Sequence, residues 1–282
     1  MMGTSALGER QLDRFRLHLI EEERSANTIE KYLRDVRALF AQYPGETRFS
    51  KEMILDYKGR LIGKYKSTSV NSMLVALNQF FRFCQREDLR VKLVKIQRSA
   101  FREHWKELTP SEYKKLVRAA QTKQKERLGL LLQTICSTGI RVSEHRFMTV
   151  EALQAGMARI ASKGKERTVF LPDKLRKRLL KYCRKKKIAS GPIFVTRNGN
   201  PMNRCNIWAE MKALCESAGV DARKCFPHNL RHLFALAYYR LEKDVVRLAD
   251  ILGHASIETT RIYTSTTDAE CIRSLTRLNL LI

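Results

Sequence analysis

The chain has 282 residues, which is long enough for two domains that each bury a hydrophobic core. Its 54 lysines and arginines against 29 aspartates and glutamates give a net charge of +25, a surplus that favours a polyanionic partner, most commonly nucleic acid. No apolar run approaches membrane-spanning length and the first residues lack the apolar stretch of a signal peptide, so we expect a cytoplasmic protein with no membrane partner.

Residues 1–100 carry four patterns of apolar residues at helical spacing and no strand pattern. Asn27, with Glu30 three residues later, predicts a capping pair at the start of the second helix. We therefore expect these residues to fold as a small four-helix domain. The apolar positions that mark the four helices are Leu12, Phe15 and Leu19; Ile29, Leu33, Val36, Leu39 and Phe40; Met53, Ile54, Tyr57 and Leu61; and Val70, Met73, Leu74, Leu77, Phe80, Phe81 and Cys84.

A short basic segment rich in hydroxyl groups, residues 64–69 (KYKSTS), joins the third helical pattern to the fourth. Lys64, Lys66 and Thr68 offer donors of the kind that bind phosphate oxygens. A solvated loop explains the same composition equally well. Both interpretations predict that the segment is exposed.

In residues 90–106 the helical periodicity fades while positive charge accumulates. This is expected of a linker that lies along a phosphate backbone, and Arg98 and Arg102 are its candidate DNA contacts. We place a linker at 101–107 and a second domain at 108–282.

The second domain begins with residues 109–112 (TPSE), which combine a capping hydroxyl, a first-turn proline and a capping-box glutamate. A further helix over 128–135 ends at Gly139, and Arg141 lies at the mouth of that turn. Burying a guanidinium group is unfavourable unless an anion or a carboxylate meets it, and Glu144 could orient this one.

The strongest strand signal of the chain lies in residues 158–161 and 167–171, on either side of a Lys-Gly-Lys turn. This arrangement predicts a β-hairpin. Its turn carries Lys163 and Lys165, either of which could reach into a site from the tip of the hairpin. A very basic helix is expected next, over 174–187.

The last block of the chain, residues 226–264, gathers three histidines, four arginines and a closing tyrosine. Its apolar spacing predicts a helix from about Pro227, with His228 and Arg231 one turn apart near the helix start. Free N–H groups and the positive end of the helix dipole favour an anion there.

A second helical run ends at Gly253, and His254 follows at once. Tyr263 lies nine residues further on. We interpret His232 and Tyr238 as core-facing side chains with satisfied polar ends.

Two alternatives explain parts of this block. Residues 248–262 could form a helix-turn-helix that reads a major groove, which would make the chain a DNA-binding regulator without catalysis. That interpretation gives no role to the pair of His228 and Arg231. His228 and His232 could hold zinc on one helix face, but the glutamate that such a motif needs is replaced by Asn229, and the seven cysteines lack C-x-x-C spacing. We therefore expect no metal.

Taken in order, four elements of the chain resemble the tyrosine site-specific recombinases, the phage integrase family. They are a T-G-x-R-x-S-E box at 138–144, a hairpin lysine in 162–167 (SKGKER), H-x-L-R-H at 228–232, and L-G-H at 252–254 followed by Tyr263. The resemblance covers nearly the whole chain and implies the form of the family without an added arm-binding domain.

The resemblance implies a mainly helical fold with a small antiparallel β-hairpin. An N-terminal four-helix, SAM-like core-binding domain that clamps DNA would occupy 1–100, and a catalytic domain 108–282. It also implies an enzyme that cuts and rejoins DNA at specific sites through a 3′-phosphotyrosine, without metal, ATP or another cofactor. The implied partners are double-stranded recombination sites, three further copies of the chain on DNA, and optional accessory DNA-bending proteins; the free protein would be a monomer.

The resemblance also assigns roles to individual residues. Tyr263 is the implied nucleophile, and Lys163 the implied acid for the leaving 5′-oxygen, with Lys165 as its rival. The phosphate would be held by Arg141, Arg231, His228 and His254, with Glu144 in support. The apolar end of the chain, residues 278–282, is expected to dock on a neighbouring copy.

Overall fold

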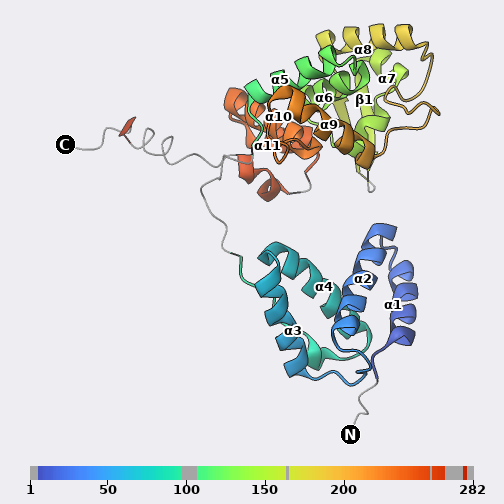
Figure 1. The fold of residues 1–282 in the computed structure, drawn as a ribbon, viewed down its shortest axis with the longest axis vertical. Helices are drawn as coiled ribbons and strands as arrows, with labels where there is room; N and C mark the ends of the chain where they lie inside the picture. Colours follow the sequence, from blue (N-terminus) through green and yellow to red (C-terminus); the bar gives the residue numbers. More distant parts are fainter. Residues whose placement is uncertain (1–5, 97–106, 163–164, 255, 264–275, 278–282) are drawn as a thin grey trace. The chain divides into compact units, whose positions relative to one another are not determined.

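A computed structural model describes residues 6–96, 107–162, 165–254, 256–263 and 276–277 of the chain. The chain divides into two compact units, Met1–Arg98 and Ser99–Ile282 (Figure 1). Of the linker expected at 101–107, only Glu107 lies within the described residues. Each unit is mainly helical and has a hydrophobic core of its own. No helix in the described part of the chain is long and apolar enough to cross a membrane.

The first unit contains all four predicted helices. They are α1 (Glu9–Glu21), α2 (Ala26–Gln42), α3 (Lys51–Lys64) and α4 (Ser67–Phe83), followed by the short 3₁₀-helix η1 (Glu87–Leu89). In the core, Phe15 of α1 and Phe80 of α4 pack edge to face with ring centroids 5.4 Å apart. The capping pair predicted at Asn27 is wrong, because α2 begins at Ala26 and the Ser25 side chain caps it by accepting from the Thr28 N–H.

The basic segment between α3 and α4 joins the two helices directly. Lys64 is the last residue of α3, Lys66 precedes α4, and Thr68 lies in the first turn of α4. All three residues are exposed. The first N–H groups of α4 have no partner within the helix, so they add donors beside the two lysines.

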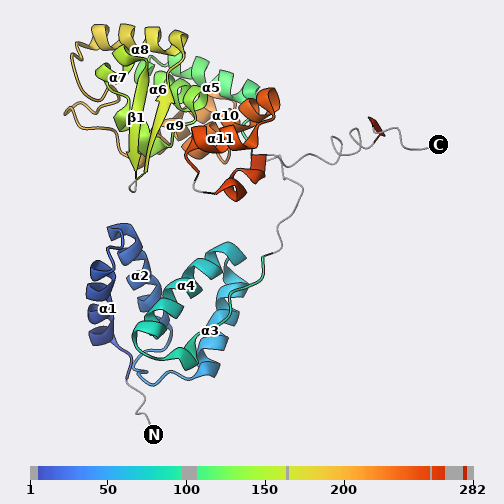
Figure 2. The ribbon, with the colours of Figure 1, turned by 180° about the vertical axis from the view of Figure 1, so that it is seen from behind.

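The second unit is organised around one buried helix, α6, against which α5, α8, α9 and α10 pack. Strands β1 and β2 form the predicted antiparallel hairpin, in which Met157 pairs with Phe170 and Ser162 with Lys165. Figure 2 shows the turn end of the two strands on the opposite side of this unit from α8. The elements are α5 (Pro110–Thr122), α6 (Glu126–Thr138), η3 (Val142–Phe147), α7 (Val150–Ala155), β1 (Met157–Ser162), β2 (Lys165–Phe170), α8 (Asp173–Lys186), α9 (Arg204–Ala218), α10 (Pro227–Glu242), α11 (Val245–Leu252), η4 (Ile257–Thr259) and η5 (Arg261–Tyr263).

The helix boundaries that matter most for the site are those the sequence predicts. The Thr109 hydroxyl accepts from the Glu112 N–H while the Glu112 carboxylate accepts from the Thr109 N–H, which completes the capping box of α5. Gly139 ends α6 with φ +67°, and a Cβ there would lie 2.5 Å from the Phe234 ring. Glycine is required at this position on both counts.

The helix-turn-helix alternative for residues 248–262 is wrong. Helix α11 ends at Leu252 and Gly253 follows in the left-handed conformation. Residues 256–263 then form two single turns of 3₁₀-helix, η4 and η5, where a recognition helix would need several turns.

Candidate active site

Arg141 is positioned by the sharp end of α6 and by Glu144. After the turn at Gly139, Arg141 is the capping residue immediately before the 3₁₀-helix η3, and Glu144 folds back onto Arg141. The Glu144 carboxylate accepts hydrogen bonds from the Arg141 backbone N–H at 2.6 Å and from Arg141 Nη1 at 2.9 Å. Arg141 Nη2 donates to the Gly253 carbonyl at 3.1 Å, and the Arg141 side chain remains 42% exposed. Arg141 is therefore held at its base while its guanidinium group stays open to solvent.

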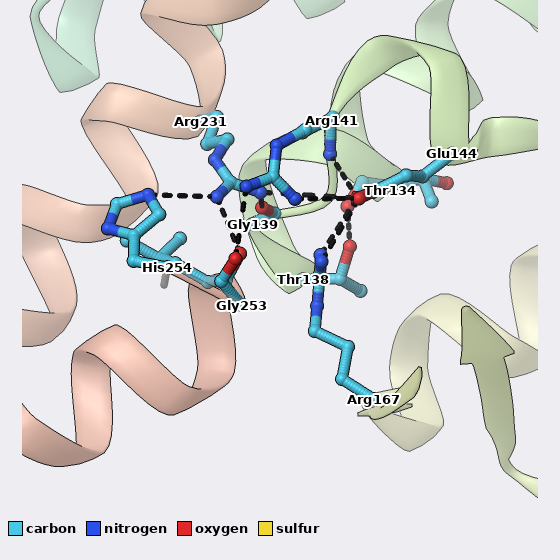
Figure 3. A network of polar contacts seen from close by, with 10 residues as sticks. Thr134, Thr138, Gly139, Arg141, Glu144, Arg167, Arg231, Gly253 and His254 are labelled. Carbon is cyan, nitrogen blue, oxygen red and sulfur yellow. Dashed lines mark hydrogen bonds and ion pairs between the residues drawn. The ribbon is translucent and has the colours of Figure 1, made fainter. Parts of the chain in front are cut away.

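Arg231 is buried between the ends of two helices. It lies in the second turn of α10 and its side chain is only 3% exposed. Its Nη1 donates to the Gly139 carbonyl at 2.6 Å (Figure 3). Its Nη2 donates to the Leu252 carbonyl, also at 2.6 Å. These carbonyls close α6 and α11, so the cation meets the negative ends of two helix dipoles. Burial and the nearby charge of Arg141 lower the pKa of Arg231 to about 10, which leaves it charged at neutral pH.

Glu144 is the carboxylate at the centre of three arginines. Besides Arg141, it accepts from Arg167 Nη1 at 3.0 Å and from Arg167 Nη2 at 2.8 Å, and Arg231 Nη1 lies 4.0 Å from its Oε2. Burial alone would raise the pKa of Glu144, but the hydrogen bonds from Arg167 and Arg141 outweigh it and hold that pKa below its ordinary value.

The cluster formed by Arg141, Arg167, Arg231 and Glu144 carries a net charge of +2, since three guanidinium groups surround one carboxylate. The positive charge of such a partly buried cluster is unbalanced until an anion arrives. A phosphate with one or two negative charges has the right sign and size, and guanidinium forks match its oxygens.

His254 connects this cluster to Tyr263. Its Nε2 lies 3.1 Å from Arg231 Nη2 and its Nδ1 2.8 Å from the Thr260 hydroxyl. Because arginine only donates, Nε2 must accept, and the proton of the neutral ring is then assigned to Nδ1. Burial and the charges of Arg231 and Arg141 lower the pKa of His254 to about 4, so the ring is neutral at pH 7.

Tyr263 closes η5 with its ring buried between two histidines. The ring lies nearly parallel to that of His254, with centroids 6.5 Å apart, and 5.0 Å from that of His232. His232 Nε2 in turn lies 3.5 Å from a carboxylate oxygen of Glu107. The prediction of His232 as a core-facing residue with a partnered polar end therefore needs one addition, its contact with Tyr263.

The remaining predicted site residues differ in how the structure places them. His228 lies in the first turn of α10, and the residue as a whole is exposed. Its ring is nevertheless partly removed from solvent, and this desolvation, together with the charges of His232 and Arg231, lowers its pKa. Lys163 lies outside the described residues, as do Arg98 and Arg102. Lys165 begins β2, paired with Ser162.

Two residues of the site were missed by sequence reasoning. Arg167 was interpreted only as the start of a strand, although the same hairpin segment carries the two lysines. Thr260 is fully buried and fixes the His254 ring. No periodic pattern marks either side chain as part of the site, so the only available signal was proximity in sequence to the motifs. Among the described residues no group of three or more His, Cys, Asp or Glu side chains is placed to hold a metal ion.

Comparison with known proteins covers both units. Residues 106–270 match the phage integrase family, and residues 12–88 match the N-terminal SAM-like domain of phage integrases. The chain is 29% identical to tyrosine recombinase XerA of Pyrococcus furiosus, covering 99% of this chain and 98% of that protein. It is 30% identical to tyrosine recombinase XerD of Halalkalibacterium halodurans, covering 89% and 91%.

Solved structures share the fold. The crystal structure of XerA recombinase aligns with a TM-score of 0.54 at 25% identity, over 97% of this chain and 99% of that one. A lambda integrase tetramer bound to a Holliday junction aligns with a TM-score of 0.74 at 18% identity, over 93% and 78%. XerH recombinase bound to its difH substrate aligns at 0.67 and 21% identity, over 88% and 78%.

Proposed function

The chain belongs to the phage integrase family and is a tyrosine recombinase, and we propose that it cuts and rejoins specific DNA sites through a covalent 3′-phosphotyrosine at Tyr263. The observation that carries this proposal is the cluster of Arg141, Arg167 and Arg231 around Glu144, which His254 joins to Tyr263. A regulator that only binds DNA has no use for a partly buried surplus of charge beside a tyrosine.

The proposed chemistry follows from the charge of a phosphodiester. Its oxygens repel nucleophiles, so a site without metal must neutralise them with fixed donors. We assign this role to the guanidinium groups of Arg141 and Arg231 and to His228, while His254, whose Nε2 accepts from Arg231, holds that arginine in place. Negative charge grows on the non-bridging oxygens as the fifth bond to phosphorus forms, so these contacts strengthen in the transition state.

In the cleavage step the Tyr263 hydroxyl oxygen bonds to phosphorus while the bond from phosphorus to the 5′-oxygen breaks. The phenol has an ordinary pKa of about 10, so the nearby positive charge assists loss of its proton to a base. We assign Lys163 as the acid that protonates the departing 5′-oxygen. The 5′-hydroxyl of another strand then attacks the phosphotyrosine, which restores the phosphodiester and the free tyrosine without ATP.

The first unit supports a role in holding DNA. Its match to the SAM-like domain and the exposed Lys64, Lys66 and Thr68 at the junction of α3 and α4 support phosphate contacts there. We infer domains at 1–100 and 108–282 joined by a linker at 101–107 that also meets DNA. The lambda integrase tetramer on a Holliday junction supports assembly of four copies of this chain on DNA. We infer that the chain free of DNA is a monomer. Accessory DNA-bending proteins remain optional partners in this proposal.

The test first finds the DNA site. The purified full chain is incubated with sheared DNA flanking its own gene, covalent complexes are trapped by denaturation, and the attached DNA is sequenced. A nicked duplex built on the mapped site should then accumulate an adduct that survives a denaturing gel.

Tyr263→Phe should bind this duplex and form no adduct. Tyr238→Phe and Tyr239→Phe are matched controls, because both tyrosines are half-buried and pack against the same hydrophobic cluster that contains Tyr263. Both variants should form the adduct at the wild-type level. If Tyr263→Phe forms the adduct and Tyr238→Phe or Tyr239→Phe does not, the nucleophile is the tyrosine replaced in that inactive control. The absence of any adduct from the wild type would refute the proposed function.

A further inference from the structure

Arg167 holds the carboxylate on which Arg141 depends. It lies in β2, and both terminal nitrogens of its guanidinium group donate to the two oxygens of Glu144, at 3.0 and 2.8 Å (Figure 3). Its side chain is 13% exposed, compared with 42% for Arg141 and 4% for Glu144. A fork of this kind fixes the plane of the carboxylate as well as its position.

Arg167 also lies directly against the second group that holds Arg141. A Cβ atom on Gly253 would lie 2.7 Å from both Cδ and Nη1 of Arg167, so the arginine passes over the bare backbone of this glycine. The Gly253 carbonyl accepts the hydrogen bond from Arg141 Nη2. Both partners of the Arg141 guanidinium group, Glu144 and Gly253, are therefore in contact with Arg167.

We propose that Arg167 is a positioning residue that presents Arg141 to the scissile phosphate, an inference that rests on the proposed function. Both terminal nitrogens of Arg167 face Glu144, so the group that meets the phosphate is Arg141 and Arg167 acts through it. Arg167 also balances the charge of Glu144, which leaves Arg141 and Arg231 to oppose the phosphate.

Loss of Arg167 would change what Glu144 does. The two carboxylate oxygens of Glu144 would lose the hydrogen bonds from Arg167 and would turn to other donors. A further donor nearby is Arg231 Nη1, which lies 4.0 Å from Glu144 Oε2. A carboxylate that draws on Arg141 and Arg231 takes up donors that the phosphate needs and lowers the charge it meets. Arg167 therefore keeps Glu144 from competing with the substrate.

The test compares Arg167→Gln with Arg159→Gln, using the full chain and the nicked duplex. Arg159 lies on β1 of the same hairpin, opposite Thr168, and is exposed, so its replacement removes the same charge without touching Glu144. Arg167→Gln should slow adduct formation by roughly 100-fold, as expected when a reacting group is misplaced by about 1 Å. Arg159→Gln should stay close to wild type, and Arg167→Lys, which keeps the charge but not the fork, should recover only part of the rate.

Two further measurements separate positioning from loss of the fold. In a methylphosphonate duplex a methyl group replaces one non-bridging oxygen, so the reacting group starts neutral and carries one less negative charge in the transition state for Arg141 to stabilise. The defects of Arg167→Gln and Arg141→Ala should shrink together on this duplex. In the double variant Arg141→Ala/Arg167→Gln the rate should fall no further than in Arg141→Ala alone, because coupled residues are not additive.

Several outcomes would overturn the proposal. Equal losses on the charged and neutral duplexes, or additive losses in the double variant, would show that Arg167 does not act through Arg141. If Arg167→Gln instead regains its cleavage rate on a duplex with a sulfur leaving group, Arg167 acts on protonation of the leaving 5′-oxygen, the step assigned to the hairpin lysine, and not through Arg141. An active wild type with Arg167→Gln indistinguishable from Arg159→Gln overturns this proposal alone, whereas an inactive wild type overturns the proposed function and this inference with it.

Discussion

Replacing Glu144 by glutamine should destabilise the second unit measurably. Glu144 is 4% exposed and accepts four hydrogen bonds from Arg141 and Arg167, two on each carboxylate oxygen, whereas the amide would turn an NH₂ group toward two of these donors. Breaking a buried ion pair costs about 3–5 kcal/mol. The Arg141 side chain is 42% exposed, so its ion pair with Glu144 contributes less, and we expect the lower end of this range, about 3 kcal/mol.

For a unit of this size, a loss of about 3 kcal/mol lowers the unfolding midpoint by roughly 6–12 °C. The assay is thermal unfolding of the full chain followed by tryptophan fluorescence, since Trp105 and Trp208, the only two tryptophans, both belong to the second unit. Glu166→Gln is the matched control, because Glu166 neighbours Arg167 on β2 and is exposed. Equal midpoints for Glu144→Gln and Glu166→Gln would refute the reasoning.

The same variant predicts a dependence on pH with a definite sign. The folded chain holds the pKa of Glu144 below its ordinary value of 4.5, so the carboxylate stabilises the fold above that pH. The contribution is lost as the pH falls through the folded pKa. The difference in midpoint between wild type and Glu144→Gln should therefore be full at pH 7 and shrink as the pH falls below the ordinary value of 4.5. A difference that grows on acidification would contradict this account of Glu144.

Three further predictions concern other parts of the chain. Lys163→Ala should cleave normal DNA poorly and recover on a duplex whose leaving 5′-oxygen is replaced by sulfur, because a thiol with a pKa of about 8.5 departs without a donated proton; recovery of Lys165→Ala instead would transfer the role. Truncation after Thr267 should preserve monomer binding and abolish cooperative assembly on a two-site duplex, which a gel-shift titration measures. The fold lowers the pKa of His254 from 6.5 to about 4, so between these pH values the unfolded chain binds a proton on His254 that the folded chain does not, and the fold loses stability as the pH falls. His254→Asn lacks this proton site and should lose less stability than wild type over that range. Equal losses in the two proteins would contradict this account.

Much of the fold could be predicted from the sequence because its boundaries are set locally. Gly139 and Gly253 end helices since the left-handed conformation suits glycine, and the Thr109 capping box needs only residues within one turn. The cap of α2 was misplaced by two residues because Ser25 and Asn27 are both good caps, and only the helix geometry chooses between them.

The site could be predicted only where a motif carried it. The arginine box, the H-x-L-R-H helix and the terminal tyrosine are all recognisable along the chain, and the roles assigned to them stay predictions. The link from Arg167 to Glu144 joins residues 23 positions apart, on different elements, and no local pattern marks it. The contact of His232 with both Glu107 and Tyr263 likewise depends on how α10 packs. Such contacts follow from tertiary packing, which composition and periodicity do not specify.

The two arginines that face the proposed phosphate are held by different means, and this decides how each can respond to an anion. Arg231 is fixed by the last carbonyls of α6 and α11, so it cannot move without moving two helices. Arg141 is open to solvent and held by Glu144 and Gly253, so an arriving phosphate can reach its free donors. Fixed charges stabilise a transition state best because they need no reorganisation when the charge develops. Arg231 supplies that fixed charge, and Arg141 can act alongside it only while Arg167 keeps Glu144 in place.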